Sequence, residues 1–252
     1  MDPLLRFSKT VQHYIKYRPG YPEAILELMQ REMAMEEFSV VADIGSGTGL
    51  LSRLFLDNDN LVYGVEPNRE MRQAAEELLD EYDNFSSVSG SAEQTTLGDE
   101  SVDFIVAGQA YHWFDPAGFR KECLRLLSKE GWVIIIWNDR NDAHSEFMQA
   151  YEAFLQTYSS DYKAVDHRRV DKKKLKKLFD KQDIREAVFD NFQQFDAEGL
   201  LGRYLSCSYA LPEDHARFEE AKKRLQQIFD QFAENNQVTM AYHTKLFYGN
   251  IH

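Results

Sequence analysis

Short apolar runs rich in β-branched residues alternate with longer segments of helical apolar spacing in the first half of the chain. The short runs are Val40–Ile44, Leu61–Glu66, Phe85–Val88, Ser101–Ala107 and Gly131–Asn138. Runs of this kind are typical of strands buried on both faces of a parallel sheet. Helical spacing follows from Leu50, Arg69 and Pro116, so we expect a doubly wound α/β sheet with helices on both faces. Asp115 is the expected cap before Pro116, and Pro22 is the expected first residue of an earlier helix.

The regular alternation ends after Asn138. Apolar spacing in the second half predicts helices at residues 147–158, 200–209 and 215–236, and strands at residues 184–195 and 238–251. A charged stretch separates two of these elements and contains the basic run from Lys172 to Lys177. This run either steers an anionic substrate or forms the solvated face of a short helix, and the second interpretation is the simpler one.

A glycine-rich turn joins the first predicted strand to the first predicted helix. Gly45, Gly47 and Gly49 follow Ile44 directly, and the helix starts at Leu50. Glycines let the backbone approach a ligand, and a helix N-terminus offers free N–H donors. A dinucleotide fingerprint would need glycine at the sixth position of the motif, where this chain has Leu50, so a nicotinamide cofactor is disfavoured.

The acidic residue before these glycines indicates a different ligand. Asp43 stands two residues before Gly-x-Gly-x-Gly, and in this pattern the chain resembles the class I S-adenosylmethionine-dependent methyltransferases. The resemblance implies that Asp43, Gly45, Ser46, Gly47 and Gly49 bind the cofactor. Backbone N–H groups and a carboxylate suit its zwitterionic amino-acid end.

A second acid ends the second predicted strand. Glu66 stands where nucleotide-binding folds place a ribose-binding carboxylate, which can accept two hydrogen bonds from the diol. Alternatively, Glu66 is a surface acid, and Asn68 is the cap of the next helix in either case. Pro67 and Met71 are further cofactor candidates, although a methionine at such a position is more often a core residue.

The resemblance extends to the ends of the third and fourth strands. It implies that Ala92 and Glu93 contact the adenine, and that Gln109 and Ala110 lie beside the methionine part. It also places aromatic residues on the substrate side, and the candidate substrate-pocket residues are Tyr21, Tyr111, Trp113 and Trp137.

His112 is the candidate catalytic residue. It could act as a general base on a hydroxyl nucleophile. A single histidine is more often structural, however, and carboxylate or stabilised-carbon nucleophiles need no base.

The N-terminal Tyr-Arg-Pro-x-Tyr-Pro string at residues 17–22 resembles a segment of trans-aconitate methyltransferase-like proteins that folds over the cofactor. Tyr14 and Arg18 are therefore added to the cofactor-binding candidates. In the alternative interpretation, the tyrosines pack in the core and Arg18 is a solvated charge.

Charge and composition restrict the partners. The chain has 42 acidic residues against 29 Lys and Arg, a net charge of −13, which argues against nucleic acid because such binding needs phosphate neutralisation. Two cysteines at unrelated positions make no disulfide framework. Asp139, Asp142 and His144 are close in the sequence, but such residues are typical of a loop and a helix cap. We therefore expect no metal-binding site there. With no leader or membrane span in the sequence, we expect a soluble, cytoplasmic protein.

Together these patterns predict one Rossmann-like domain with a seven-stranded, mostly parallel sheet, an antiparallel edge strand and a helical lid insertion. Its expected parts are a cap segment (1–35), the cofactor-binding core (36–138), the lid (139–182) and a C-terminal edge hairpin with inserted helices (183–252). The expected function is S-adenosylmethionine-dependent O- or C-methylation of a small molecule by a monomer or homodimer, and an anionic acceptor is one option. A cofactor-binding protein without turnover and a nicotinamide-dependent oxidoreductase are the alternatives.

Overall fold

The computed structural model describes residues 11–160, 162, 172–180 and 184–252. The chain divides into two compact units. Unit 1 comprises Met1–Pro19, Asp139–Arg169 and Asp190–His243, and unit 2 comprises Gly20–Asn138, Val170–Phe189 and Thr244–His252.

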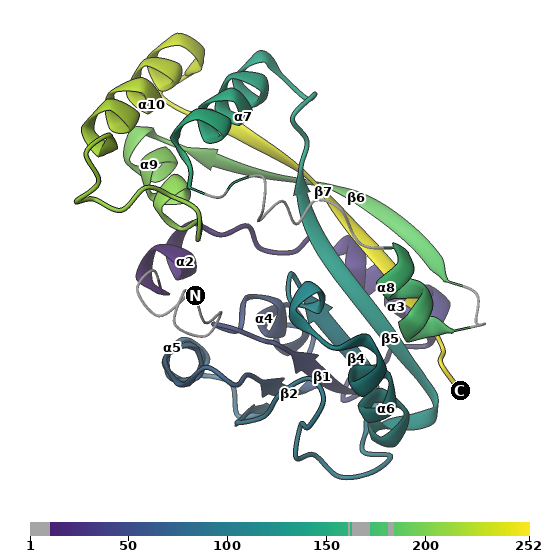
Figure 1. Ribbon diagram of the computed structural model, residues 1–252. Coiled ribbons are helices and arrows are strands. Elements are labelled where there is room, and N and C mark those ends of the chain that lie inside the picture. Colours follow the sequence, from purple (N-terminus) through teal and green to yellow (C-terminus); the bar gives the residue numbers. More distant parts are fainter. Residues whose placement is uncertain (1–10, 161, 163–171, 181–183) are drawn as a thin grey trace. The chain divides into compact units, whose positions relative to one another are not determined.

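A seven-stranded sheet has the order β3-β2-β1-β4-β5-β7-β6 (Figure 1). Its strands are β1 (Val40–Ile44), β2 (Leu61–Val65), β3 (Phe85–Val88), β4 (Val102–Gly108), β5 (Leu127–Arg140), β6 (Arg185–Phe195) and β7 (Val238–Gly249). Strands β1 to β5 pair in parallel, and one edge pair is antiparallel. The mostly parallel sheet predicted from the sequence is therefore confirmed. The strand order reverses between β1 and β4, where ligands of open α/β sheets bind at the carboxyl ends.

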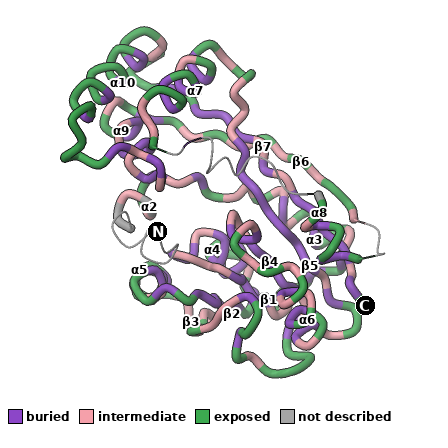
Figure 2. Tube along the Cα trace, viewed as in Figure 1, coloured by how far each residue is buried: buried purple, intermediate pink, exposed green. Residues whose placement is uncertain are grey.

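Helices cover both faces of the sheet in unit 2. They are α3 (Ala24–Met33), α4 (Leu50–Leu56), α5 (Arg69–Leu78), α6 (Pro116–Leu126) and α8 (Lys172–Phe179). Successive strand residues point to opposite faces. Val41 and Val106 therefore pack with residues of α3 and α4, whereas Ala42 and Ile105 pack with residues of α6 and α8. Most residues of β1 and β4, and residues Val133 to Asn138 of β5, are buried (Figure 2).

Unit 1 is built on aromatic packing. Its helices are α2 (Val11–Tyr17), α7 (Glu146–Tyr158), α9 (Ala197–Leu205) and α10 (Phe218–Phe232). Phe154 stacks edge-to-face on Tyr204 with 5.1 Å between ring centroids, and both belong to one buried cluster with Phe229. The ring of Tyr17 lies so close to Gly202 that a Cβ there would clash with it. Glycine is therefore required at this helix contact.

Some element boundaries differ from the prediction. Helix α9 begins at Ala197, three residues earlier than expected, because the Asp196 side chain accepts a hydrogen bond from the Gly199 amide at 2.7 Å and caps it. Pro22 was expected at the first helical position, but α3 begins at Ala24 after Glu23. Helix α2 was not predicted. None of the described helices is long and apolar enough to cross a membrane.

Candidate functional site

All three glycines of the turn after β1 adopt positive φ angles, of 72°, 58° and 82° for Gly45, Gly47 and Gly49. A Cβ at Gly45 would lie 2.7 Å from the Ala110 Cβ, and one at Gly49 would lie 2.5 Å from Leu79 Cδ1. A Cβ at Gly47 would have no atom within 4 Å. Gly45 and Gly49 are therefore needed for packing, whereas the Gly47 backbone borders open space that a ligand can occupy.

Asp43 is buried at the carboxyl end of β1, with 1% of its surface exposed. Its Oδ2 accepts a hydrogen bond from the Ser52 hydroxyl at 2.7 Å, and its Oδ1 has no partner within the described part of the chain. Burial raises the pKa of Asp43 to about 7, the Ser52 hydrogen bond opposes this rise, and the neighbouring Glu66 adds to it. A buried carboxylate oxygen without a partner suits a cationic group of a ligand.

Glu66 joins the end of β2 to the glycine turn. Its Oε2 accepts from the Gly47 amide at 3.0 Å, and its Oε1 accepts from the Asn68 amide at 2.8 Å. Burial raises the pKa of this carboxyl, and the two backbone N–H groups partly offset that rise. These contacts fix the carboxylate beside the turn and leave each oxygen a second lone pair for a ligand.

The residues after Glu66 begin helix α5. The Asn68 side chain accepts from the Met71 amide at 3.0 Å, which confirms the predicted cap. Met71 is buried, and Pro67 is exposed with its carbonyl accepting from Arg72. Of these two cofactor candidates, only Pro67 has an exposed side chain.

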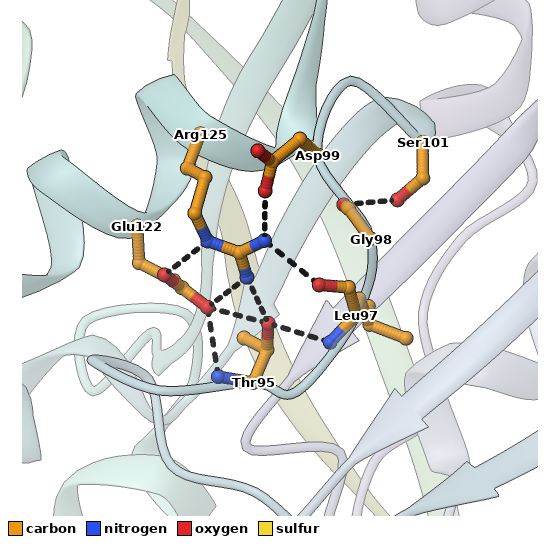
Figure 3. A network of polar contacts seen from close by, with 7 residues as sticks. All are labelled: Thr95, Leu97, Gly98, Asp99, Ser101, Glu122 and Arg125. Atoms are coloured by element: carbon orange, nitrogen blue, oxygen red, sulfur yellow. Dashed lines mark hydrogen bonds and ion pairs between the residues drawn. The ribbon is translucent and has the colours of Figure 1, made fainter.

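A polar network anchors the loop that follows β3 (Figure 3). Arg125 Nη2 lies 2.7 Å from Glu122 Oε1, and Arg125 Nη1 donates to the Leu97 carbonyl at 2.8 Å. The same Glu122 oxygen accepts from the amide and hydroxyl of Thr95, at 2.8 and 2.6 Å. Burial alone would raise the pKa of Glu122, but Arg125 and Thr95 hold it at about 2. The sequence interpretation missed this network.

The same loop carries the adenine-side candidates. Ala92 is buried, whereas Glu93 is exposed and its Oε1 accepts from the Asp115 amide at 2.9 Å. The carboxylate of Glu93 therefore already has a structural partner at the start of α6. The predicted cap of α6 is confirmed, because the Asp115 side chain accepts a hydrogen bond from the Gly118 amide at 2.7 Å.

Three candidates lie at the end of β4, and one of them, Ala110, contacts the glycine turn. Gln109 has a positive φ of 57°, and its side chain donates to the Asn138 carbonyl at 2.9 Å. Ala110 lies against Gly45, and the Tyr21 hydroxyl lies against Gly108. Such a backbone angle in a non-glycine residue is uncommon and often occurs at functional sites.

The aromatic candidates lie in two different environments. Tyr111 is buried and donates from its hydroxyl to the Lys174 carbonyl at 2.7 Å, and Trp137 is also buried. Trp113 is 42% exposed. The His112 ring centroid lies 4.5 Å from that of Trp113 and 6.1 Å from that of Trp137.

Helix α8, which contains the basic run, packs against this segment. Lys174 Nζ donates to the His112 carbonyl at 2.9 Å, and Leu175 and Leu178 are buried. The run therefore has a buried apolar face in addition to its charged one, and one of its lysines holds the backbone of the candidate catalytic residue.

Two cofactor candidates come from the N-terminal segment. Arg18 belongs to unit 1, where its Nη2 donates to the Ser206 carbonyl at 2.8 Å. The side chain of Tyr14 lies outside the described residues.

Within the described chain, no group of three His, Cys, Asp or Glu residues could hold a metal ion.

Comparisons with known proteins agree on one family. The family model described as "Methyltransferase domain" matches residues 42–135. An uncharacterized methyltransferase-like protein of Schizosaccharomyces pombe is 27% identical over 97% of this chain and 94% of its own length. An uncharacterized methyltransferase of Mycobacterium tuberculosis is 32% identical, over 56% of this chain and 55% of its own length.

Solved structures show the same fold. A type II methyltransferase candidate from Anaeromyxobacter dehalogenans superposes with a TM-score of 0.68 at 17% identity, covering 93% of this chain and 98% of its own. A candidate methyltransferase of an antibiotic biosynthesis pathway from Anabaena variabilis gives a TM-score of 0.62 at 20% identity, covering 92% and 98%. The sequence matches, together with the glycine turn and its two carboxylates, support a class I S-adenosylmethionine-dependent methyltransferase.

Proposed function

We propose that this chain transfers a methyl group from S-adenosylmethionine to a small-molecule acceptor, at an oxygen or a carbon atom. The observation that carries the proposal is the pair of buried carboxylates, Asp43 and Glu66, at the glycine turn whose central residue, Gly47, borders open space. Such a site can hold a cationic amino-acid end and a ribose diol side by side. The acidic net charge of −13 supports a small acceptor over a nucleic acid.

In this proposal each residue at the turn has one role. Asp43 accepts from the ammonium group through Oδ1, and the amides of Gly45 to Gly49 approach the carboxylate. Glu66 accepts from the ribose hydroxyls, and the hydrogen bond that it accepts from the Gly47 amide joins the end of β2 to the glycine turn. Ala92 and Glu93 border the adenine, while Gln109 and Ala110 border the methionine chain. Arg18 and Tyr14 are kept as further cofactor contacts.

The bound cofactor supplies an electrophilic methyl group on a sulfonium, and the chain supplies alignment and exclusion of water. Tyr21 and the exposed Trp113 are proposed to line the acceptor side. Tyr111 and Trp137, which are buried, shape that side from beneath. For a hydroxyl acceptor, His112 takes the proton as general base, and its carbonyl bond to Lys174 fixes its backbone.

A thermal-shift panel followed by an acceptor screen tests the proposal. S-adenosylmethionine and S-adenosylhomocysteine should raise the melting temperature, NAD should not, and mass detection should find a product 14 Da heavier for at least one small acceptor. Stabilisation by NAD alone would favour the oxidoreductase. Cofactor binding without any methylated product across a broad screen would favour the binding protein without turnover.

A further inference from the structure

Trp113 is an exposed tryptophan in the segment that contacts the glycine turn. Its residue is 42% exposed, although large aromatic side chains are usually well buried. The Trp113 amide donates to the Ala110 carbonyl at 2.9 Å, and Ala110 lies against Gly45. The short helix η1 (Tyr111–Trp113) therefore starts beside the turn assigned to the cofactor. An exposed indole at this position offers a flat apolar surface to a ligand.

The imidazole of His112 lies beside this indole. The two ring centroids are 4.5 Å apart, and the ring planes are inclined by 44°. A planar ligand that stacks on Trp113 is therefore next to the candidate general base.

Helix α8 brings positive charge to the same segment. Its sequence, Lys-Lys-Lys-Leu-Lys-Lys-Leu-Phe, contains five lysines and no acidic residue. Two hydrogen bonds join it to η1: the Tyr111 hydroxyl donates to the Lys174 carbonyl at 2.7 Å, and Lys174 Nζ donates to the His112 carbonyl at 2.9 Å. Lys177 follows Lys174 by one turn on the same side of the helix. It is exposed and forms no ion pair among the residues that the structure describes.

This basic helix stands out in a chain whose net charge is −13. Exposed charge of one sign beside a site attracts ligands of the opposite sign and raises their local concentration. A solvated helix face explains the lysines of the run by themselves. It does not explain why α8 is hydrogen-bonded to two successive residues of η1, Tyr111 and His112.

We propose that the methyl acceptor is an aromatic carboxylate that bears the reacting hydroxyl, with its ring on Trp113 and its carboxylate toward Lys177. This inference rests on the proposed function, since it names the acceptor of that reaction. The hydroxyl proton goes to His112 as the oxygen bonds to the methyl carbon and the carbon–sulfur bond of the cofactor breaks, which leaves a neutral thioether. All residues of this site belong to unit 2.

Calorimetric titration of the full chain with para-hydroxybenzoate tests the inference, with and without S-adenosylhomocysteine. Two comparison compounds separate its parts. Para-hydroxybenzamide keeps the aromatic ring and lacks the charge, whereas cyclohexanecarboxylate keeps the charge and lacks the planar ring. We expect para-hydroxybenzoate to bind more tightly than either compound, and its advantage over the amide to shrink as added salt screens the lysines.

Two exposed positions supply the variants. Lys177→Glu replaces an attraction by a repulsion, so it should weaken para-hydroxybenzoate about tenfold at low salt and leave the amide unchanged. Trp113→Leu should weaken both aromatic compounds about fivefold to tenfold and leave cyclohexanecarboxylate unchanged. The matched controls are Lys222→Glu, on the exposed face of α10, and Trp132→Leu, at a half-buried tryptophan of β5. Both controls should bind para-hydroxybenzoate as the wild type does.

S-adenosylmethionine binding and methyl transfer are measured on the same samples, so failure of this inference and failure of the proposed function are distinguishable. No binding of para-hydroxybenzoate, or equal affinity for the acid and the amide, overturns the inference even where the cofactor binds and another acceptor is methylated. Equal affinity for para-hydroxybenzoate and cyclohexanecarboxylate overturns the contact with Trp113. Binding that depends on Trp113 and Lys177 in a protein that does not bind the cofactor keeps the anion site and refutes its assignment to a methyl acceptor.

Discussion

Glu66 Oε2 lies 3.0 Å from the backbone nitrogen of Gly47, so the acid at the end of β2 is hydrogen-bonded to the middle of the turn after β1. The two motifs are 19 residues apart in the sequence. Strand pairing of Ile44 with Val65 brings their ends to the same edge of the sheet. The carboxylate predicted to bind the ribose and the turn predicted to bind the amino-acid end of the cofactor are therefore joined in one structural element.

Glu66→Ala should abolish most S-adenosylmethionine binding. The change removes the proposed ribose acceptor and leaves the Gly47 and Asn68 amides without their carboxylate partner, which should also cost about 1–3 kcal/mol of stability. Calorimetric titration and chemical denaturation measure the two effects separately. Glu76→Ala on the exposed face of α5 is the control. Unchanged cofactor affinity in Glu66→Ala would refute the ribose assignment.

Gly47→Ala should impair binding much more than folding. A Cβ at this position meets no atom within 4 Å, so only the positive φ of 58° costs stability, about 1–2 kcal/mol. The same Cβ enters the space assigned to the cofactor. Gly45→Ala is the informative comparison, because its Cβ would lie 2.7 Å from Ala110 and should destabilise the protein itself. Full cofactor affinity in a folded Gly47→Ala protein would place the ligand elsewhere.

Cofactor affinity should rise about tenfold between pH 6 and pH 8. Burial raises the pKa of Asp43 to about 7, and only its ionised form attracts the cofactor ammonium. The folded protein keeps this proton up to a higher pH than the unfolded chain does. The contribution of Asp43 to the free energy of unfolding therefore falls as pH rises from about 4 to 7. Asp43→Asn should flatten the binding profile. A slope that persists in Asp43→Asn would assign the titration to another group.

Arg125→Met should reduce stability at neutral pH and remove part of the acid sensitivity. The folded pKa of Glu122 is about 2 against an ordinary 4.5, so its contribution is complete above pH 4.5 and is lost as pH falls toward 2. The shift corresponds to at most about 3 kcal/mol. Urea denaturation at pH 7 and pH 3 measures the difference, with Arg53→Met, which breaks an exposed ion pair, as the control. Equal losses at both pH values would contradict this role of the network.

For a hydroxyl acceptor, His112→Ala should lower kcat by about 10²–10⁴ and leave cofactor affinity unchanged. The imidazole takes no part in the glycine turn, so binding and turnover should separate. His144→Ala, at another histidine, is the control for turnover. An unchanged kcat would assign His112 a structural role beside Trp113.

The sequence was most informative where buried strands meet glycine. The predicted bounds of β1 and β3 are those of the structure, and β2 ends one residue before the predicted Glu66, because each is a short apolar run between turn residues. Asp115 and Asn68 were recognised as caps because short polar side chains before an apolar periodic segment have few other uses.

Contacts between distant side chains could not be predicted in this way. Arg125 and Lys174 look like solvated helix charges in the sequence, yet they bind Glu122 and the His112 carbonyl. Arg203 is a further example, because nothing in the residues beside it in the sequence indicates that its charged side chain is buried. The positive φ of Gln109 is set by its bonds to β5 and has no glycine to mark it.

Hydrogen–deuterium exchange of the full chain with and without S-adenosylmethionine tests the central claim most directly. We expect added protection at residues 45–50, which form the glycine turn, and at residues 66–71, which begin helix α5. Exchange at the exposed end of α10 should not change and serves as the internal reference. Protection confined to other segments, with both of these unchanged at saturating cofactor, would contradict the site described for this methyltransferase.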